Sequence, residues 1–289
     1  MLIDNLIAVL EIPAKLARSA RRILKRRQLP KHFFIEVTNR DASKTISQAI
    51  PPVVYQTVKT KLIDDEHHAG IEEFRNLNPE LSFVVYDEGE TDAYMESAWS
   101  NHPIFEIYRR ALYGQIKADI FRLCVLNDRG GYYLDTNKAA FINWSSLHER
   151  DDHAFLTFDS IDCLNFPESE LAEKLEFPHR FFAQWAFGFI SAHPVTTHAI
   201  NRIVEMAPLF AGRTFRDVRN AIFAFSGPAM LTEVIRNYLR EEGFHGVSIA
   251  GEYFYGTGVS RIRGAHRMPE APMHYTRARR TAILAEVES

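Results

Sequence analysis

Asp119 and Arg122 are the first pair of side chains in this chain that could act together on a ligand. They are three residues apart in an apolar stretch, so on a helix both project from one face. That face would offer carboxylate acceptors beside a fork of guanidinium donors. A one-turn surface ion pair is the alternative, and it would stabilise the helix by under ~1 kcal/mol.

A second polar group follows a few residues later, where Asp135 and Asn137 come directly after the aromatic and apolar segment 132–134. Gly130 and Gly131 precede this segment and predict the end of the helix, because glycine adopts positive φ freely. Ligands of open α/β sheets bind beyond the carboxyl ends of strands. Two oxygen-bearing side chains at such an end suit a hard divalent cation that bridges phosphates. A turn that merely caps the strand is the alternative.

The elements that must position these residues alternate along the chain. Apolar and β-branched runs predict strands, and apolar residues at helical spacing predict the helices between them. The expected fold class is α/β, a mainly parallel sheet flanked by helices. Strands are expected at Val53–Thr57, Phe83–Tyr86, Tyr132–Leu134, Phe155–Phe158 and Ala186–Ser191, and helices near Ile71–Asn76, Phe105–Gln115, Ala118–Asn127, Thr196–Met206 and Ala229–Arg240.

The polar run resembles the core motif of DXD-containing glycosyltransferases of the GT32 type, A-D-x-x-R-x-x-x-L-x-x-x-G-G-x-Y-x-D-x-D. Flanking segments at 50–57, 78–87, 189–194 and 226–231 are also similar to elements of that family, so the resemblance covers roughly residues 49–235. The matching core positions are Ala118, Asp119, Arg122, Leu126, Gly130, Gly131, Tyr133, Asp135 and Asn137.

The resemblance implies a GT-A-like nucleotide-sugar-binding fold and a hexosyltransferase that retains anomeric configuration with the help of Mn²⁺ or Mg²⁺. Its donor would be a nucleotide sugar, UDP-hexose or GDP-mannose, and its acceptor a polysaccharide, such as a capsule glycan, or a glycolipid. The implied roles are catalytic for Asp119, Arg122 and Asp135; donor-binding for Tyr55, Gln56, Asp119, Arg122, Gln184 and Gly227; and metal-binding for Asp135, Asn137, His266 and His274.

Four departures from the family pattern are present, and two of them keep a second interpretation open. Tyr55 stands in the usual histidine position, and Val58 replaces a common tryptophan. The two that favour the second interpretation are Asn137 in place of the usual second aspartate, and a C-terminal segment that offers only His266 and His274 where the family commonly has a His-His-Trp element. A neutral amide oxygen should bind metal more weakly than a carboxylate. The alternative is therefore a degenerate nucleotide-sugar-binding protein with little or no transferase activity.

The N-terminal segment differs in charge from the rest of the chain. Residues 1–32 contain eight Lys/Arg and two acidic residues, a net +6, which leaves −9 for the remainder of a chain with a total charge of −3. We expect a basic amphipathic helical extension over residues 1–48 and one glycosyltransferase domain over 49–289. The basic face could contact anionic lipid through residues 1–31, or pack on its own domain or a second subunit.

Composition and segment order argue against several other classes of protein. No apolar run reaches the roughly 18 residues that span a bilayer, and apolar-before-basic order inverts a secretory signal. The two cysteines show no metal spacing, which favours a reducing compartment. These features predict a cytoplasmic protein, peripheral at most to the membrane face. A nucleic-acid-binding protein led by the basic segment is disfavoured by the acidic remainder.

Overall fold

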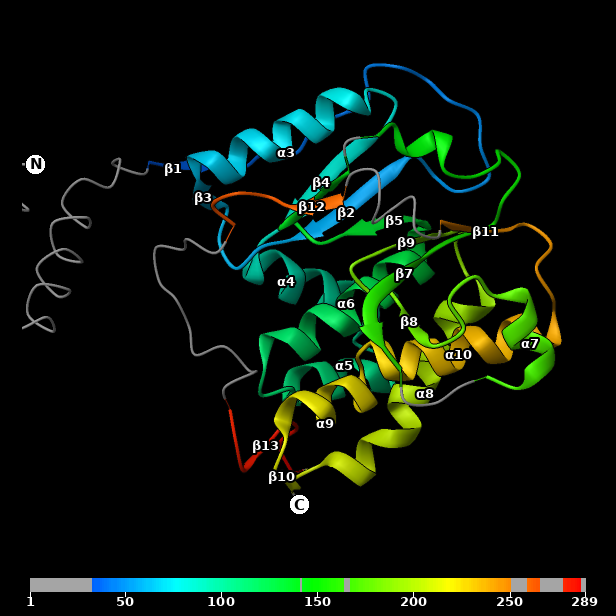
Figure 1. The fold of residues 1–289 in the computed structure, drawn as a ribbon. Helices are drawn as coiled ribbons and strands as arrows, with labels where there is room; N and C mark the ends of the chain where they lie inside the picture. Colours follow the sequence, from blue (N-terminus) through cyan, green and yellow to red (C-terminus); the bar gives the residue numbers. More distant parts are fainter. Residues whose placement is uncertain (1–32, 141, 164–166, 251–258, 266–277, 287–289) are drawn as a thin grey trace, which may run out of the picture. The chain divides into compact units, whose positions relative to one another are not determined.

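A computed structural model of the chain describes residues 33–140, 142–163, 167–250, 259–265 and 278–286 (Figure 1). The chain divides into two units, residues 1–33 and 34–289, and the elements below belong to the second. The basic segment 1–31 and the candidate ligands His266 and His274 lie outside the described residues. The domain boundary expected at residue 48 stays a prediction.

A central sheet runs in the order β4-β2-β5-β9-β7-β11, and β8 pairs with β7 at its side. Neighbours β2 and β4, β2 and β5, and β7 and β11 are parallel, whereas β9 is antiparallel to both of its neighbours. The expectation of a mainly parallel sheet is confirmed. The bounds are β2 Val53–Thr57, β4 Ser82–Tyr86, β5 Gly131–Leu134, β7 Ala154–Asp162, β8 Arg180–Phe182, β9 Ala186–Phe189 and β11 Val247–Ala250.

Helices cover both faces of this sheet (Figure 1). Helix α3 packs on one face, and α4, α5, α6, α8, α9 and α10 contribute to the core on the other. The bounds are α3 Asp65–Leu77, α4 Glu88–Trp99, α5 Pro103–Arg110, α6 Gly114–Arg129, α7 Ser169–Lys174, α8 Pro194–Phe210, α9 Val218–Phe225 and α10 Pro228–Glu241.

Successive side chains of β2 and β5 point to opposite faces of the sheet and belong to two different apolar clusters. Val54 and Tyr132 pair across the strands and join the cluster under α3, whereas Tyr55 and Tyr133 pair one residue later and join the cluster under α6. Successive side chains of a strand point to opposite faces, so strands buried on both faces read as continuous apolar runs. This pairing also brings the carboxyl ends of β2 and β5 side by side.

Three short antiparallel pairs and one 3₁₀ turn complete the described elements. The β6–β12 pair continues directly from the segment that follows β5, so it lies next to the polar run Asp135–Asn137. The pairs are β1 Phe34–Glu36 with β3 Leu62–Asp64, β6 Lys138–Ala140 with β12 Val259–Arg261, and β10 Thr214–Phe215 with β13 Thr281–Ala282, and the turn is η1 Trp144–Ser146.

Two helix predictions are corrected by the structure. The single helix expected over 105–115 is interrupted, because Ala111 takes an extended backbone and the Leu112 amide donates to the Ile283 carbonyl. The helix expected from Ile71 begins earlier, at Asp65, because the Asp64 side chain accepts from the Glu66 amide and caps it. In the described part of the chain no helix is long and apolar enough to cross a membrane.

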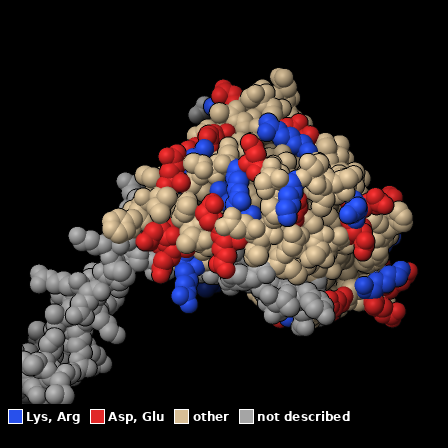
Figure 2. All heavy atoms as spheres, turned by 90° about the horizontal axis from the view of Figure 1, so that it is seen from above, with Lys and Arg blue, Asp and Glu red and all other residues tan. Residues whose placement is uncertain are grey.

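Charged side chains are mixed on the face seen in Figure 2, where Lys and Arg lie among Asp and Glu. Ion pairs join residues distant in sequence, such as Lys61 with Glu90 and Lys117 with Asp92. Exposed pairs of this kind contribute little to stability, so the fold rests on the two apolar clusters.

Candidate active site

A cavity of about 200 Å³ lies beyond the carboxyl ends of β2 and β5. The loop after β2 and the turn after β5 form much of its wall, and α6, the first turn of α3, the strand 62–64 and Ala265 also contribute. This is the position that open α/β sheets use for ligands. The lining residues are Thr57, Val58, Lys59, Thr60, Leu62, Ile63, His67, Gln115, Ala118, Arg122, Tyr133, Asp135, Thr136, Asn137 and Ala265.

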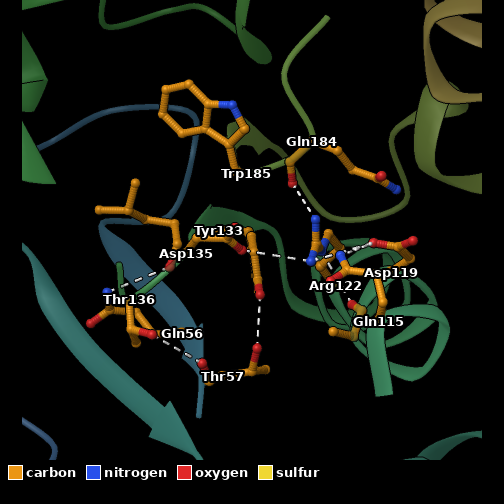
Figure 3. Close-up of polar contacts among 12 residues, drawn as sticks. Gln56, Thr57, Gln115, Asp119, Arg122, Tyr133, Asp135, Thr136, Gln184 and Trp185 are labelled. Atoms are coloured by element: carbon orange, nitrogen blue, oxygen red, sulfur yellow. Dashed lines mark hydrogen bonds and ion pairs between the residues drawn. The ribbon is translucent and has the colours of Figure 1, made fainter. Parts of the chain in front are cut away.

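Arg122, drawn in Figure 3, is a cation of this wall. It is only 3% exposed. Its Nη1 donates to the Gln184 carbonyl at 2.6 Å, and its Nε donates to the Ala118 carbonyl at 3.2 Å. Its guanidinium carbon lies 4.5 Å from the centroid of the Tyr133 ring. The guanidinium is therefore fixed by donated hydrogen bonds and ring stacking, and its charge is directed at the cavity.

Asp119 lies behind Arg122 and does not line the cavity. Its Oδ1 is 3.4 Å from Arg122 Nη2 and accepts from Gln115 at 3.2 Å, and its Oδ2 accepts from the Ser226 hydroxyl at 3.0 Å. Burial raises the pKa of Asp119 to about 7, although Arg122 opposes this shift. The expected contact between Asp119 and donor hydroxyls stays a prediction, and the structure gives Asp119 contacts that position Arg122.

Gln184 closes a ring of contacts around Asp119 and Arg122. Figure 3 shows its carbonyl against the Arg122 guanidinium. Its backbone carbonyl accepts from Arg122, and its side-chain amide donates to the Ser226 carbonyl at 2.7 Å. The ring Asp119–Arg122–Gln184–Ser226 thus joins α6 to the start of β9 and to the turn before α10. Gly227 follows in that turn, where a Cβ would lie 2.7 Å from Phe223 Cα, so only glycine fits.

Asp135 is the carboxylate of the cavity wall. Its amide donates to the Trp185 carbonyl at 2.8 Å, and its Oδ1 lies 3.6 Å from Arg122 Nη2. The side chain keeps 29% exposure. Burial in the site raises the pKa of Asp135, and the charges of Arg122 and Lys138 oppose this. A partly exposed carboxylate beside a buried cation can accept donor hydroxyls or ligate a metal.

The backbone of the 135–137 turn is held by neighbouring elements. The Lys138 amide donates to the Asp135 carbonyl at 3.0 Å, and the Ile262 amide donates to the Asn137 carbonyl at 3.0 Å. His67 Nε2 lies 2.7 Å from the Thr136 carbonyl, which can only accept, so this nitrogen carries the proton. The turn therefore presents Asp135 and Asn137 to the cavity from a fixed backbone.

The donor set fits a hard divalent cation in part. Asn137 Oδ1 is buried without a hydrogen-bond partner among the described residues, and Asp135 supplies a second oxygen on the same wall. An unpartnered buried acceptor on a residue that lines a cavity is the kind of group a cation would satisfy. The described ranges contain no group of three or more His, Cys, Asp or Glu able to hold a metal, so further ligands would have to come from elsewhere, such as the diphosphate and water.

Tyr55 and Gln56, expected to bind the donor, lie outside the cavity lining. Tyr55 is buried in the cluster under α6, and burial raises its pKa to about 12. Gln56 donates to the Leu134 carbonyl at 3.5 Å, and its Oε1 is buried without a partner among the described residues. Their donor-binding roles stay predictions, as do those of Gln184 and Gly227.

Several residues that contact the site were not among the site residues predicted from the motif. Thr57 bonds the Tyr133 hydroxyl at 2.8 Å, and Gln115, Ser226 and His67 hold the charged groups or the turn. Gln115 could have been found, because it lies one helical turn before Asp119. His67 carries no such signal, because it precedes the region in which a helix was expected.

The α/β sheet and its strand-end cavity define a class of ligand-binding fold, and comparison with known proteins shows which family part of the chain resembles. Residues 64–146 match the model described as the glycosyltransferase sugar-binding region containing the DXD motif. This match confirms the resemblance to DXD-containing glycosyltransferases. The mainly parallel sheet flanked by helices agrees with the α/β fold class expected from the sequence.

Two curated relatives carry mannosyl chemistry in their names, and one of them is a mannosyltransferase by name. The chain is 25% identical over 199 residues to the initiation-specific alpha-1,6-mannosyltransferase of Schizosaccharomyces pombe, which covers 66% of this chain and 49% of that protein. It is 27% identical over 89 residues to a mannosyl phosphorylinositol ceramide synthase of Saccharomyces cerevisiae. This alignment covers 30% of this chain and 23% of that protein. The chain thus spans about half of the first relative and about a quarter of the second.

Two solved structures also resemble the chain at low identity. PaToxG glycosyltransferase has a TM-score of 0.49 and 16% identity, over 68% of this chain and 72% of that one. The ligand-free glycosyltransferase domain of the YGT toxin has a TM-score of 0.46 and 11% identity, over 78% of this chain and 84% of that one.

Proposed function

We propose that this protein is a glycosyltransferase that moves a hexose from a nucleotide-diphosphate sugar to a glycan or a lipid-linked acceptor. One observation carries the proposal: Arg122, Asp135 and Asn137 meet on one cavity beyond the ends of β2 and β5, within the region that matches the family model. The donor is UDP-hexose or GDP-mannose. The mannosyltransferase relatives favour a mannosyl donor.

This reaction depends mainly on stabilisation of the leaving group. The departing nucleoside diphosphate develops negative charge, and donors that are already oriented stabilise it without reorganisation. Arg122 is such a group, because Gln184 and Tyr133 hold its guanidinium at the cavity wall. Asp135 accepts hydroxyl groups of the sugar or ribose from the same wall. Transfer retains the anomeric configuration in this proposal.

Mn²⁺ or Mg²⁺ is the proposed cofactor, held by Asp135 and Asn137. When bound, such an ion neutralises charge on the diphosphate. The candidate ligands His266 and His274 stay in the proposal. Asn137 Oδ1, which has no partner among the described residues, supports the assignment.

The acceptor belongs to polysaccharide synthesis, such as that of a capsule, or is a glycolipid. One relative is named as a mannosyl phosphorylinositol ceramide synthase, which is consistent with a lipid-linked acceptor. Peripheral contact of the basic residues 1–31 with anionic lipid at the cytoplasmic membrane face would bring the enzyme to such acceptors. Replacing Arg21, Arg22, Arg26 and Arg27 should then abolish co-sedimentation with anionic vesicles, and unchanged partitioning would refute the contact.

The proposal is tested with a panel of UDP- and GDP-hexoses, with Mn²⁺ or with EDTA, following donor hydrolysis and product anomer by NMR. Metal-dependent turnover of one donor with retention supports it. Tight binding without turnover would favour the degenerate binding protein, which the neutral Asn137 in place of an aspartate also favours. Failure of every donor to bind would refute both.

A further inference from the structure

We propose that His67 is a positioning residue for the turn 135–137, and through this turn for Asp135 and Asn137. The inference rests on the proposed function, since it concerns the same cavity. It goes beyond the motif, in which His67 has no part.

His67 reaches the turn from the first turn of α3. Its ring is 5% exposed and lines the cavity, and its Nε2 donates to the Thr136 carbonyl at 2.7 Å. This carbonyl belongs to the residue between Asp135 and Asn137. The peptide that links the two candidate ligands is therefore held from outside the turn by one imidazole.

The start of α3 is itself held rigidly. Asp64 caps the helix, and a Cβ on Gly264 would lie 3.0 Å from the His67 amide nitrogen. A Cβ on Gly70 would collide with Ile262, whose amide donates to the Asn137 carbonyl. The segment 262–265 thus packs closely on α3. The His67 imidazole and the Ile262 amide bond the carbonyls of two consecutive residues of the turn, Thr136 and Asn137.

Loss of the imidazole donor should release the Thr136 peptide while leaving the Ile262 bond in place. A side chain that orients a metal-binding or substrate-binding group from behind typically contributes 10- to 100-fold to affinity. We expect a loss of this order in the binding of a nucleoside diphosphate with Mn²⁺, because Asp135 and Asn137 both depend on the turn.

The test measures the affinity of UDP and GDP with Mn²⁺ by calorimetry, beside thermal unfolding of each variant. His67→Phe keeps a ring without a donor, and His67→Leu is a second donor-free variant should the first not fold. His67→Gln supplies an amide donor, and His68→Phe is the matched control on the next residue of α3. Donor-free variants should lose affinity on the order of 10- to 100-fold, His67→Gln should recover most of it, and His68→Phe should bind like the wild type.

A double variant separates positioning from general destabilisation. If His67 acts through the turn, the losses in His67→Phe and Asp135→Ala will be strongly less than additive, whereas independent effects would add. Folded donor-free variants that bind as tightly as the wild type would overturn the inference and leave the proposed function standing. If the wild type binds neither UDP nor GDP, the proposed function fails and the inference fails with it.

Discussion

Arg122 Nη2 lies 3.6 Å from Asp135 Oδ1, and this contact joins helix α6 to the polar turn beyond β5. The same nitrogen lies 3.4 Å from Asp119 Oδ1. One guanidinium therefore stands between a fully buried carboxylate and one that is open to the cavity. The balance of these charges determines how much positive charge the cavity offers to a diphosphate.

Arg122→Lys should lower kcat/KM by about 100-fold or more, since removing one preorganised donor from a charge-stabilising site typically costs that much. Lysine keeps the charge but cannot reach the Gln184 carbonyl and both carboxylates together. Donor hydrolysis measures the effect. Arg109→Lys, at a position with a 64% exposed side chain, is the control and should retain activity.

Asp119→Asn should remove a pH dependence from diphosphate binding. The pKa of Asp119 is about 7, raised by burial, so in the wild type Asp119 ionises as the pH rises through neutrality and then offsets Arg122. Affinity for UDP or GDP should fall between pH 6 and 8, on the order of tenfold for an interaction change of one pKa unit. Calorimetry across this range should show the fall in the wild type and a flat profile in the variant.

Ser226→Ala tests the same carboxylate from the other side. The Ser226 hydroxyl donates to Asp119 Oδ2 and favours its charged form, so removing it should raise the pKa of Asp119 further. The midpoint of the binding profile should move to higher pH. A midpoint that stays in place or moves to lower pH would argue against Asp119 as the titrating group.

Asn137→Asp should strengthen metal binding, because a second carboxylate adds charge where the chain now has a neutral oxygen. The Mn²⁺ concentration that gives half-maximal donor binding should fall by about tenfold, as expected for one improved charged contact. Titration of free Mn²⁺ by electron paramagnetic resonance measures it. Asn143→Asp, at an exposed position after β6, should leave the titration unchanged.

His193 should make the fold sensitive to acid. Its Nδ1 accepts from the Val195 amide and its Nε2 lies 2.9 Å from His153 Nδ1, so the ring is neutral with its proton on Nε2. Burial lowers the pKa of His193 to about 3, and the neighbouring His153 adds to this. Neutral His193 contributes its full share to the free energy of unfolding above the ordinary histidine pKa of 6.5. This contribution is lost as the pH falls toward 3, by up to about 1.4 kcal/mol per pH unit.

The measurement is denaturant unfolding at a series of pH values for the wild type and His193→Asn. Asparagine can still cap α8 but does not titrate. The variant should therefore lose less stability than the wild type between pH 6.5 and 4. Equal losses would show that other groups carry the acid sensitivity.

Much of the site could be predicted because its residues follow local rules. The spacing of Asp119 and Arg122 places them on one helical face, and the glycine pair before β5 fixes where the strand begins. Asp135 and Asn137 then fall on the cavity wall as expected. These inferences use only neighbours along the chain, which periodicity and backbone preference describe well.

What could not be predicted depends on partners distant in sequence. Asp119 faces away from the cavity because its Oδ2 accepts a hydrogen bond from the hydroxyl of Ser226, 107 residues later in the chain. His67 meets Thr136 across 69 residues, and the break after α5 depends on a bond from Leu112 to Ile283. No pattern within one element contains such contacts, since they arise only when the elements pack.

The most direct test of the central claim is donor hydrolysis by the wild type and by Asp135→Ala, with Asp162→Ala as a control at a 74% exposed carboxylate. If the cavity is a nucleotide-sugar site, the wild type and the control will turn over one UDP- or GDP-hexose with Mn²⁺, and Asp135→Ala will not. Equal turnover by a folded Asp135→Ala protein would contradict the account.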